Sequence, residues 1–218
     1  MKLLDVPQSG SQAGTTSSRN RYGQYRRTRA IPVNPATTFQ GTVRARMSAF
    51  AALWRTLTDA QRAGWEALGA QMLRTDSLGQ SYSLNGFGAF LSVNTTLVAA
   101  GDAQTLAAPA LVTPPTPLTV VITLTAAAFS LAYTPTPLGA GQRLFSFASP
   151  QTSAGRSYWS DYRLIAVSAA AAASPANIFA AYVARLGTPV VTNRVFVFLQ
   201  TYQGGFLSGP LRASAVVA

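Results

Sequence analysis

Apolar side chains recur at helical spacing in the part of the chain that follows residue 37. The steps of three and four residues place them on one face of an amphipathic helix. This stripe consists of Phe39, Val43, Met47, Phe50, Trp54 and Leu57. Thr58-Asp59-Ala60-Gln61 forms a capping box that predicts the start of a second helix.

The second helix has apolar positions at Trp65, Leu68 and Met72, and a third helix is predicted over 85–99, with Asn85 as its cap. The chain therefore has a small helical region of three short helices over 38–100. We expect Trp54 and Trp65 to lie in its core. Three short helices enclose little apolar volume, so this region should pack against a neighbouring part of the protein.

The pattern changes to the two-residue period of β-strands after residue 117. Strands are predicted over 118–124, 128–133, 143–148, 162–167, 195–202 and 211–217, and 180–186 fits either a strand or a short helix. Six or seven short strands in about 100 residues are typical of an immunoglobulin or fibronectin III-like sandwich. Between the two regions, the prolines of 101–117 predict a stiff linker.

Residues 1–37 are predicted to form an arm, whose segment 8–18 is rich in Ser, Gly, Thr and Gln and has no hydrophobic period, so that it should be extended or flexible in isolation. The sequence thus indicates an α+β fold: an extended N-terminal arm over 1–37, the helical region over 38–100, the Pro-rich linker over 101–117 and a C-terminal all-β sandwich over 118–218.

Positive charge is the main compositional feature of the chain. Seventeen Lys and Arg against six Asp and Glu give a net charge of +11, and sixteen of the seventeen are arginine. Arginine binds carboxylates and phosphates through a planar fork, so the surplus indicates an anionic partner. The high Ala and Arg content also fits a GC-rich genome and general solubility. The candidate partner-binding residues are Arg19, Arg21, Tyr22, Tyr25, Arg26, Arg27, Arg29, Arg44 and Arg46.

The composition argues against catalysis. The chain contains no His and no Cys, which removes the commonest general base, the thiol nucleophile and the usual zinc ligands. It also lacks a Walker loop and a G-x-S-x-G motif. We therefore predict that the protein is not an enzyme and has no cofactor or metal site. The chain has no run of about 18 apolar residues, so we predict no membrane span.

Four segments, Ser18–Arg27, Val33–Thr37, Leu57–Trp65 and Leu84–Phe90, resemble a group of tailed-phage and prophage virion structural proteins. Members of this group join an Arg/Gly-rich arm and a helical hairpin to an Ig-like β-sandwich, and the resemblance covers about 18–99. It implies a capsid decoration or cement protein, or another head or tail component of the virion. The implied partners are capsid, portal or tail subunits, bound by a homo-oligomer or by many copies.

Two other functions also fit the residues. The Arg-rich arm, together with Arg44, Arg46 and Arg55, is compatible with nucleic-acid binding. The segment Arg156–Tyr162 places Tyr158, Trp159 and Tyr162 in a polar-aromatic loop that suits a carbohydrate- or receptor-binding module. The alternative for this loop is a strand edge on which the rings simply pack.

Overall fold

The protein is described by a computed structural model that covers residues 9–31, 33–34, 36–76 and 78–218. Its fold is α+β, with four helices and several antiparallel sheets in the described residues. The chain divides into two compact units, Met1–Arg46 and Met47–Ala218. The first eight residues of the predicted arm lie outside the described residues.

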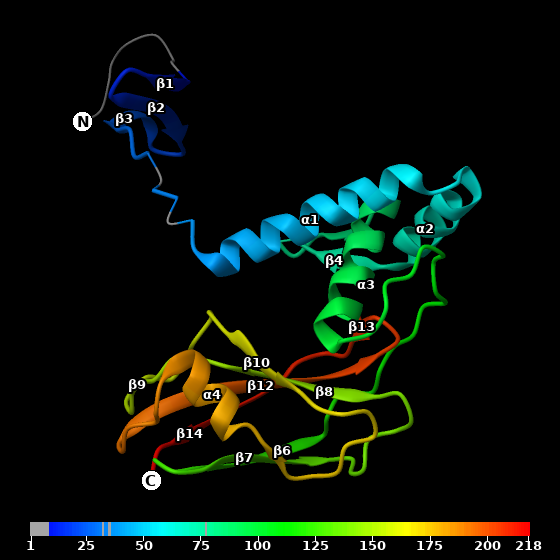
Figure 1. Cartoon of the computed structure of the whole chain (residues 1–218). Helices are drawn as coiled ribbons and strands as arrows, with labels where there is room; N and C mark the ends of the chain where they lie inside the picture. The colour runs from blue at the N-terminus through cyan, green and yellow to red at the C-terminus, as the bar shows by residue number, and fades with distance from the viewer. Residues whose placement is uncertain (1–8, 32, 35, 77) are drawn as a thin grey trace. The chain divides into compact units, whose positions relative to one another are not determined.

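The first unit contains a three-stranded antiparallel sheet in the order β1-β2-β3 (Figure 1). Its strands are β1 (Gly10–Gln12), β2 (Thr15–Asn20) and β3 (Gly23–Thr28). The sequence predicted an extended arm here, and the structure differs because the extended segments pair with one another. Polar turns allow this pairing: the Tyr22 amide donates to Asn20 Oδ1 at 2.9 Å, as in an Asx-turn.

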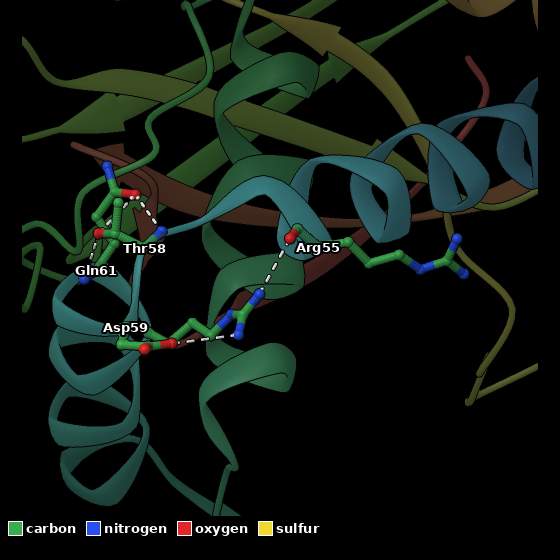
Figure 2. Close-up of polar contacts among 5 residues, drawn as sticks. Arg55, Thr58, Asp59 and Gln61 are labelled. Atoms are coloured by element: carbon green, nitrogen blue, oxygen red, sulfur yellow. Dashed lines mark hydrogen bonds and ion pairs between the residues drawn. The ribbon is translucent and has the colours of Figure 1, made fainter.

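Three helices lie in the predicted helical region, namely α1 (Thr38–Thr56), α2 (Asp59–Gln71) and α3 (Gly86–Ala100). The predicted capping box is confirmed, because the Gln61 amide donates to Thr58 Oγ1 at 3.3 Å and the Thr58 amide donates to Gln61 Oε1 at 3.0 Å (Figure 2). Asn85 caps α3 as predicted, through Oδ1 and the Gly88 amide. A short hairpin, β4 (Leu73–Thr75) and β5 (Ser81–Ser83), joins α2 to α3.

The helical core is aromatic and depends on the neighbouring sheet. Trp65 is fully buried, and its ring meets that of Phe90 edge-on with centroids 5.3 Å apart. The same cluster of buried residues includes Phe145, Tyr202 and Phe206 from strands. The expectation that these helices need a neighbour is therefore confirmed. In the apolar stripe of α1, Phe50 is buried and Trp54 is half-buried against this cluster, whereas Phe39, Val43 and Met47 are exposed.

The C-terminal strands form two sheets, with orders β11-β7-β6 and β10-β8-β12-β13, and β14 and β9 also pair with β12 (Figure 1). The strands of the first sheet are β6 (Thr119–Leu124), β7 (Phe129–Thr134) and β11 (Ala176–Asn177). Those of the second are β8 (Arg143–Ala148), β9 (Thr152–Ser153), β10 (Arg163–Val167), β12 (Asn193–Gln203), β13 (Phe206–Leu207) and β14 (Leu211–Val216). The ambiguous segment is a helix, α4 (Phe179–Leu186).

Both sheets contribute to one apolar core. Leu131 of β7, Leu144 of β8 and Val197 of β12 are fully buried in the same cluster. The residues of β12 that alternate with Val197 point away from this core, because successive side chains of a strand project to opposite faces of the sheet. Thus the second sheet has one face toward this core, and its other face carries Phe145 and Tyr202 toward the helices.

The Pro-rich segment 101–117 contains neither helix nor strand, but it lies within the second unit and packs against the rest of that unit. The Trp65 indole N–H donates to the Leu106 carbonyl at 2.9 Å, and Asn94 bonds to both backbone groups of Thr105. Pro114 and Pro117 are buried. The segment is therefore held in place by hydrogen bonds to α2 and α3, in addition to joining the helices to the sheets.

Candidate partner-binding surface

Seven of the nine predicted partner-binding residues lie on one β-hairpin, formed by β2, β3 and the connection between them. Arg19 is on β2, and Tyr25, Arg26 and Arg27 are on β3. Arg29 follows β3, where its amide donates to the Gly14 carbonyl at 2.8 Å and closes the sheet. The arginines of this hairpin are all exposed.

The strand register divides these side chains between the two faces of the sheet. Arg26 is the cross-strand partner of Ser17, and its Nε donates to Ser17 Oγ at 3.3 Å. Arg19, two residues beyond Ser17, shares that face, whereas Tyr25 and Arg27 lie on the opposite face. The sequence alone placed these residues in one group, and the pairing of the strands separates them.

Arg21 and Tyr22 form the tip of the hairpin. The Arg21 guanidinium lies over the Tyr22 ring, 4.7 Å from its centroid, and donates to its hydroxyl at 2.5 Å. Tyr22 is 67% exposed, which is unusual for a large aromatic side chain. The guanidinium and the ring are thus presented together, as a flat cationic-aromatic pair that suits carboxylate or phosphate groups.

Arg44 and Arg46 lie on α1 and are exposed, and Arg44 donates to Asn34 Oδ1 at 3.0 Å. The first unit has eight basic side chains and one acidic side chain, and the second has nine arginines and five acidic side chains. The first unit therefore carries +7 of the total +11, although it has only 46 of the 218 residues. Its described residues contain no Asp or Glu.

Several arginines of the second unit are used within it. Arg62 donates to the Arg55 carbonyl at 3.0 Å and pairs with Asp59 at 3.5 Å beside the capping box (Figure 2). Arg143 pairs with Asp102 at 2.6 Å. These contacts hold the second unit together, so its arginines contribute less to an anion-binding surface than the arginines of the hairpin.

A second candidate site is a small cavity on the second sheet, on the face that points away from the core shared by the two sheets. Its volume is about 210 Å³. It is lined by Ser157, Tyr158, Trp159, Tyr162, Phe196, Arg212, Ala213 and Ser214. The sequence indicated the three aromatic residues of the loop but missed Arg212 and Ser214. Period-two alternation puts those two on one face of β14, yet it does not reveal that the aromatic loop lies above them.

In the described part of the chain, no helix is long and apolar enough to cross a membrane. The same residues hold no group of three or more His, Cys, Asp or Glu that could bind a metal ion. The arginine hairpin and the aromatic cavity are the sites whose side chains the sequence had already indicated.

Comparison of the chain with protein-family models, with curated proteins and with solved structures finds no match.

Proposed function

We propose that this protein is a structural component of a tailed-phage virion, such as a capsid decoration or cement protein or another head or tail part. It attaches to acidic surfaces of other virion proteins through the arginine hairpin. The observation that carries this proposal is the concentration of exposed arginines in Gly10–Arg46, a segment with no acidic residue. The resemblance of residues 18–99 to such proteins supports it.

The construction of the hairpin sheet favours attachment to a partner. A small sheet is marginally stable in water unless it buries an apolar face. The described strands β1, β2 and β3 consist of Gly, Ser, Thr, Gln, Asn, Arg and one Tyr, so neither face is apolar. Since both faces carry arginine, the sheet suits a seam between two acidic subunits better than one flat surface.

The C-terminal part is an immunoglobulin or fibronectin III-like sandwich in this proposal. Support comes from the strand order: β6, β7 and β11 share one sheet, and β10, β8, β12 and β14 are neighbours in the other. In sequence order β6, β7 and β11 correspond to strands A, B and E of one immunoglobulin sheet, and β8, β12 and β14 correspond to strands C, F and G of the other. Such a domain projects from a shell while the basic segment holds it there.

Many weak contacts are sufficient for this role. Exposed ion pairs contribute about 0–1 kcal/mol each, so one hairpin binds weakly. A homo-oligomer, or many copies on a lattice, gains avidity because later contacts form at high effective concentration. We therefore expect several copies on each particle.

The test uses particles from the strain that encodes the chain, mixed with purified protein and sedimented. The variant Arg19→Gln/Arg21→Gln/Arg27→Gln should lose most of its co-sedimentation. A matched control, Arg55→Gln/Arg74→Gln/Arg163→Gln, removes the same charge from the second unit and should retain it. Equal binding by both variants, or no binding by the wild type, contradicts the proposal.

Nucleic-acid binding is the second candidate, and one observation favours it. Beyond Thr15–Ser17, which pair with β1, the hairpin is a two-stranded antiparallel ribbon that carries arginine and tyrosine, and such a ribbon fits the DNA major groove. This function predicts tight binding to duplex DNA, with an affinity that falls by a log–log slope of about 0.9 per phosphate contact as salt increases. Weak binding with little salt dependence in a gel-shift assay leaves the virion role as the better explanation.

A further inference from the structure

The aromatic cavity of the second unit has a floor on the sheet and a wall from a loop. Phe196 of β12 is paired with Ser214 of β14, and Phe198 is paired with Arg212. Cross-strand partners share a face, so Phe196, Ser214 and Arg212 form one surface. The loop residues Ser157, Tyr158, Trp159 and Tyr162 close the cavity on another side.

Only some of the aromatic rings at the cavity are packed against other rings of the protein. Phe198 stacks on Phe147 with centroids 4.2 Å apart and meets Tyr162 edge-on at 4.8 Å, so it belongs to a packed aromatic group. Tyr158, in contrast, is 62% exposed although it lines the cavity. An exposed ring at the rim of a cavity is available to stack on a ligand.

The loop that bears the aromatic residues is held in place by its own contacts. The Arg156 guanidinium lies 4.5 Å from the Trp159 ring centroid, and its Nε donates to the Tyr158 carbonyl at 3.1 Å. Arg194 of β12 donates to the Arg156 carbonyl at 2.9 Å. The Trp159 indole N–H donates to the Asp161 carbonyl. A site fixed in this way loses little conformational entropy when a ligand binds.

The charges around the cavity favour an anionic ligand. Arg212 lines it and is exposed, and Arg156 lies against Trp159 at its wall. The lining residues include no acidic side chain. Hydroxyl groups of Ser157, Tyr158 and Ser214 add hydrogen-bonding capacity beside the arginine.

We propose that this cavity binds a sugar ring that carries a carboxylate, such as a uronic acid unit of an acidic polysaccharide. The apolar face of the sugar stacks against the Tyr158 and Trp159 rings together, its hydroxyl groups bond to the serines, and its carboxylate pairs with Arg212. The cavity is smaller than the about 300–1,000 Å³ of pockets for drug-sized ligands, so it fits a single ring. This inference is independent of the arginine hairpin.

The experiment is saturation-transfer-difference NMR on the full chain, with D-glucuronate as the probe and D-glucose as its neutral counterpart. This method detects the weak binding expected of one sugar ring. Wild-type protein should transfer saturation to the ring protons of glucuronate and bind it more tightly than glucose. Trp159→Ala should abolish the transfer, and Arg212→Gln should weaken glucuronate binding about fivefold, to the level of glucose.

The control variant is Arg163→Gln, which removes an exposed arginine that does not line the cavity and should leave binding unchanged. Thermal unfolding of each variant shows whether it is folded, and Arg212→Gln decides the question if Trp159→Ala is not. An absence of transfer to glucuronate overturns the proposal, as does equal binding of both sugars by the wild type. Binding that Arg212→Gln leaves unchanged overturns it as well.

Discussion

The Tyr202 hydroxyl on β12 donates a hydrogen bond to the carboxylate of Asp102, which lies just after the C-terminus of α3. Arg143 of β8 pairs with the other carboxylate oxygen at 2.6 Å and also donates to the Ala100 carbonyl. Burial raises the pKa of Tyr202, and the hydrogen bond to Asp102 raises it further. One carboxylate thus joins the end of a helix to two strands of the sheet.

Asp102→Ala should therefore destabilise the protein by about 1–3 kcal/mol, because it leaves a half-buried arginine and a buried tyrosine without their shared acceptor. Urea unfolding followed by circular dichroism measures this change. The control Asp161→Ala removes an exposed carboxylate and should change stability by less than about 0.5 kcal/mol. If Asp102→Ala is as stable as this control, the cluster does not stabilise the junction.

A double-mutant cycle adds a second test of the same cluster. Tyr202→Phe removes the donor hydroxyl and keeps the ring that stacks on Phe145. Its effect should be smaller in the Asp102→Ala background than in the wild type, since the acceptor is already gone. Additive effects would mean that the two residues act independently.

Asn94 should be the most sensitive position for the docking of segment 101–117. It is fully buried, and its side chain bonds to the Phe90 carbonyl and to both the amide and the carbonyl of Thr105. Asn94→Ala leaves buried backbone groups without partners and should cost about 2–3 kcal/mol. Hydrogen exchange at the Thr105 amide should become faster, while the strands of the first sheet keep their protection. An unchanged rate would show that the segment is held by other contacts.

Short-range signals in the sequence were sufficient to predict most elements. The capping box at Thr58, the alternation over 128–133 and the β-branched run over 118–124 each determine a local structure, and each appears where it was predicted. The hairpin of β4 and β5 was missed because its three-residue strands are too short to show a period. The segment 180–186 is helical, and the helix buries Tyr182 on one face. The sequence left strand and helix open because the short apolar pattern of this segment fits the period of either.

The candidate sites depend on contacts between distant residues, which the sequence does not reveal. The arginines were identified by composition, but their division between two faces follows from the pairing of Ser17 with Arg26. Trp159 was identified by its loop, whereas Arg212 joins it only because β14 lies against β12. The virion role, the predicted absence of catalysis and the partners stay predictions.

Two glycines of α2 should respond oppositely to alanine. A Cβ at Gly69 would lie 2.5 Å from the Leu84 carbonyl oxygen, so the backbone at the start of α3 would have to move. Gly69→Ala should therefore destabilise the protein by about 1–3 kcal/mol. At Gly64 the Cβ would lie 3.6 Å from the Ala108 Cβ, an ordinary contact, and Gly64→Ala should stabilise the helix by about 0.5–1 kcal/mol. The two melting temperatures, measured side by side, test this; equal shifts would contradict the close approach of α2 and α3.

Stability should fall at alkaline pH because of buried tyrosines. Burial raises the pKa of Tyr182 to about 12 from its ordinary value of 10.0, and burial also raises the pKa of Tyr133. The folded state therefore keeps the Tyr182 proton in a pH range where the unfolded chain has lost it. Its contribution is complete below the ordinary tyrosine pKa and is lost as pH rises through the folded value, at about 1.4 kcal/mol for each pH unit.

The variant Tyr182→Phe separates this effect from general alkaline unfolding. It cannot ionise and loses only the hydrogen bond to the Ser149 carbonyl at 3.2 Å. At neutral pH it should be about 1 kcal/mol less stable than the wild type. Above pH about 10 its stability should decline less steeply, so that the two curves cross within about one pH unit and the variant is the more stable protein as pH approaches 12. Parallel curves from urea unfolding at a series of pH values would show that Tyr182 is not the group that titrates.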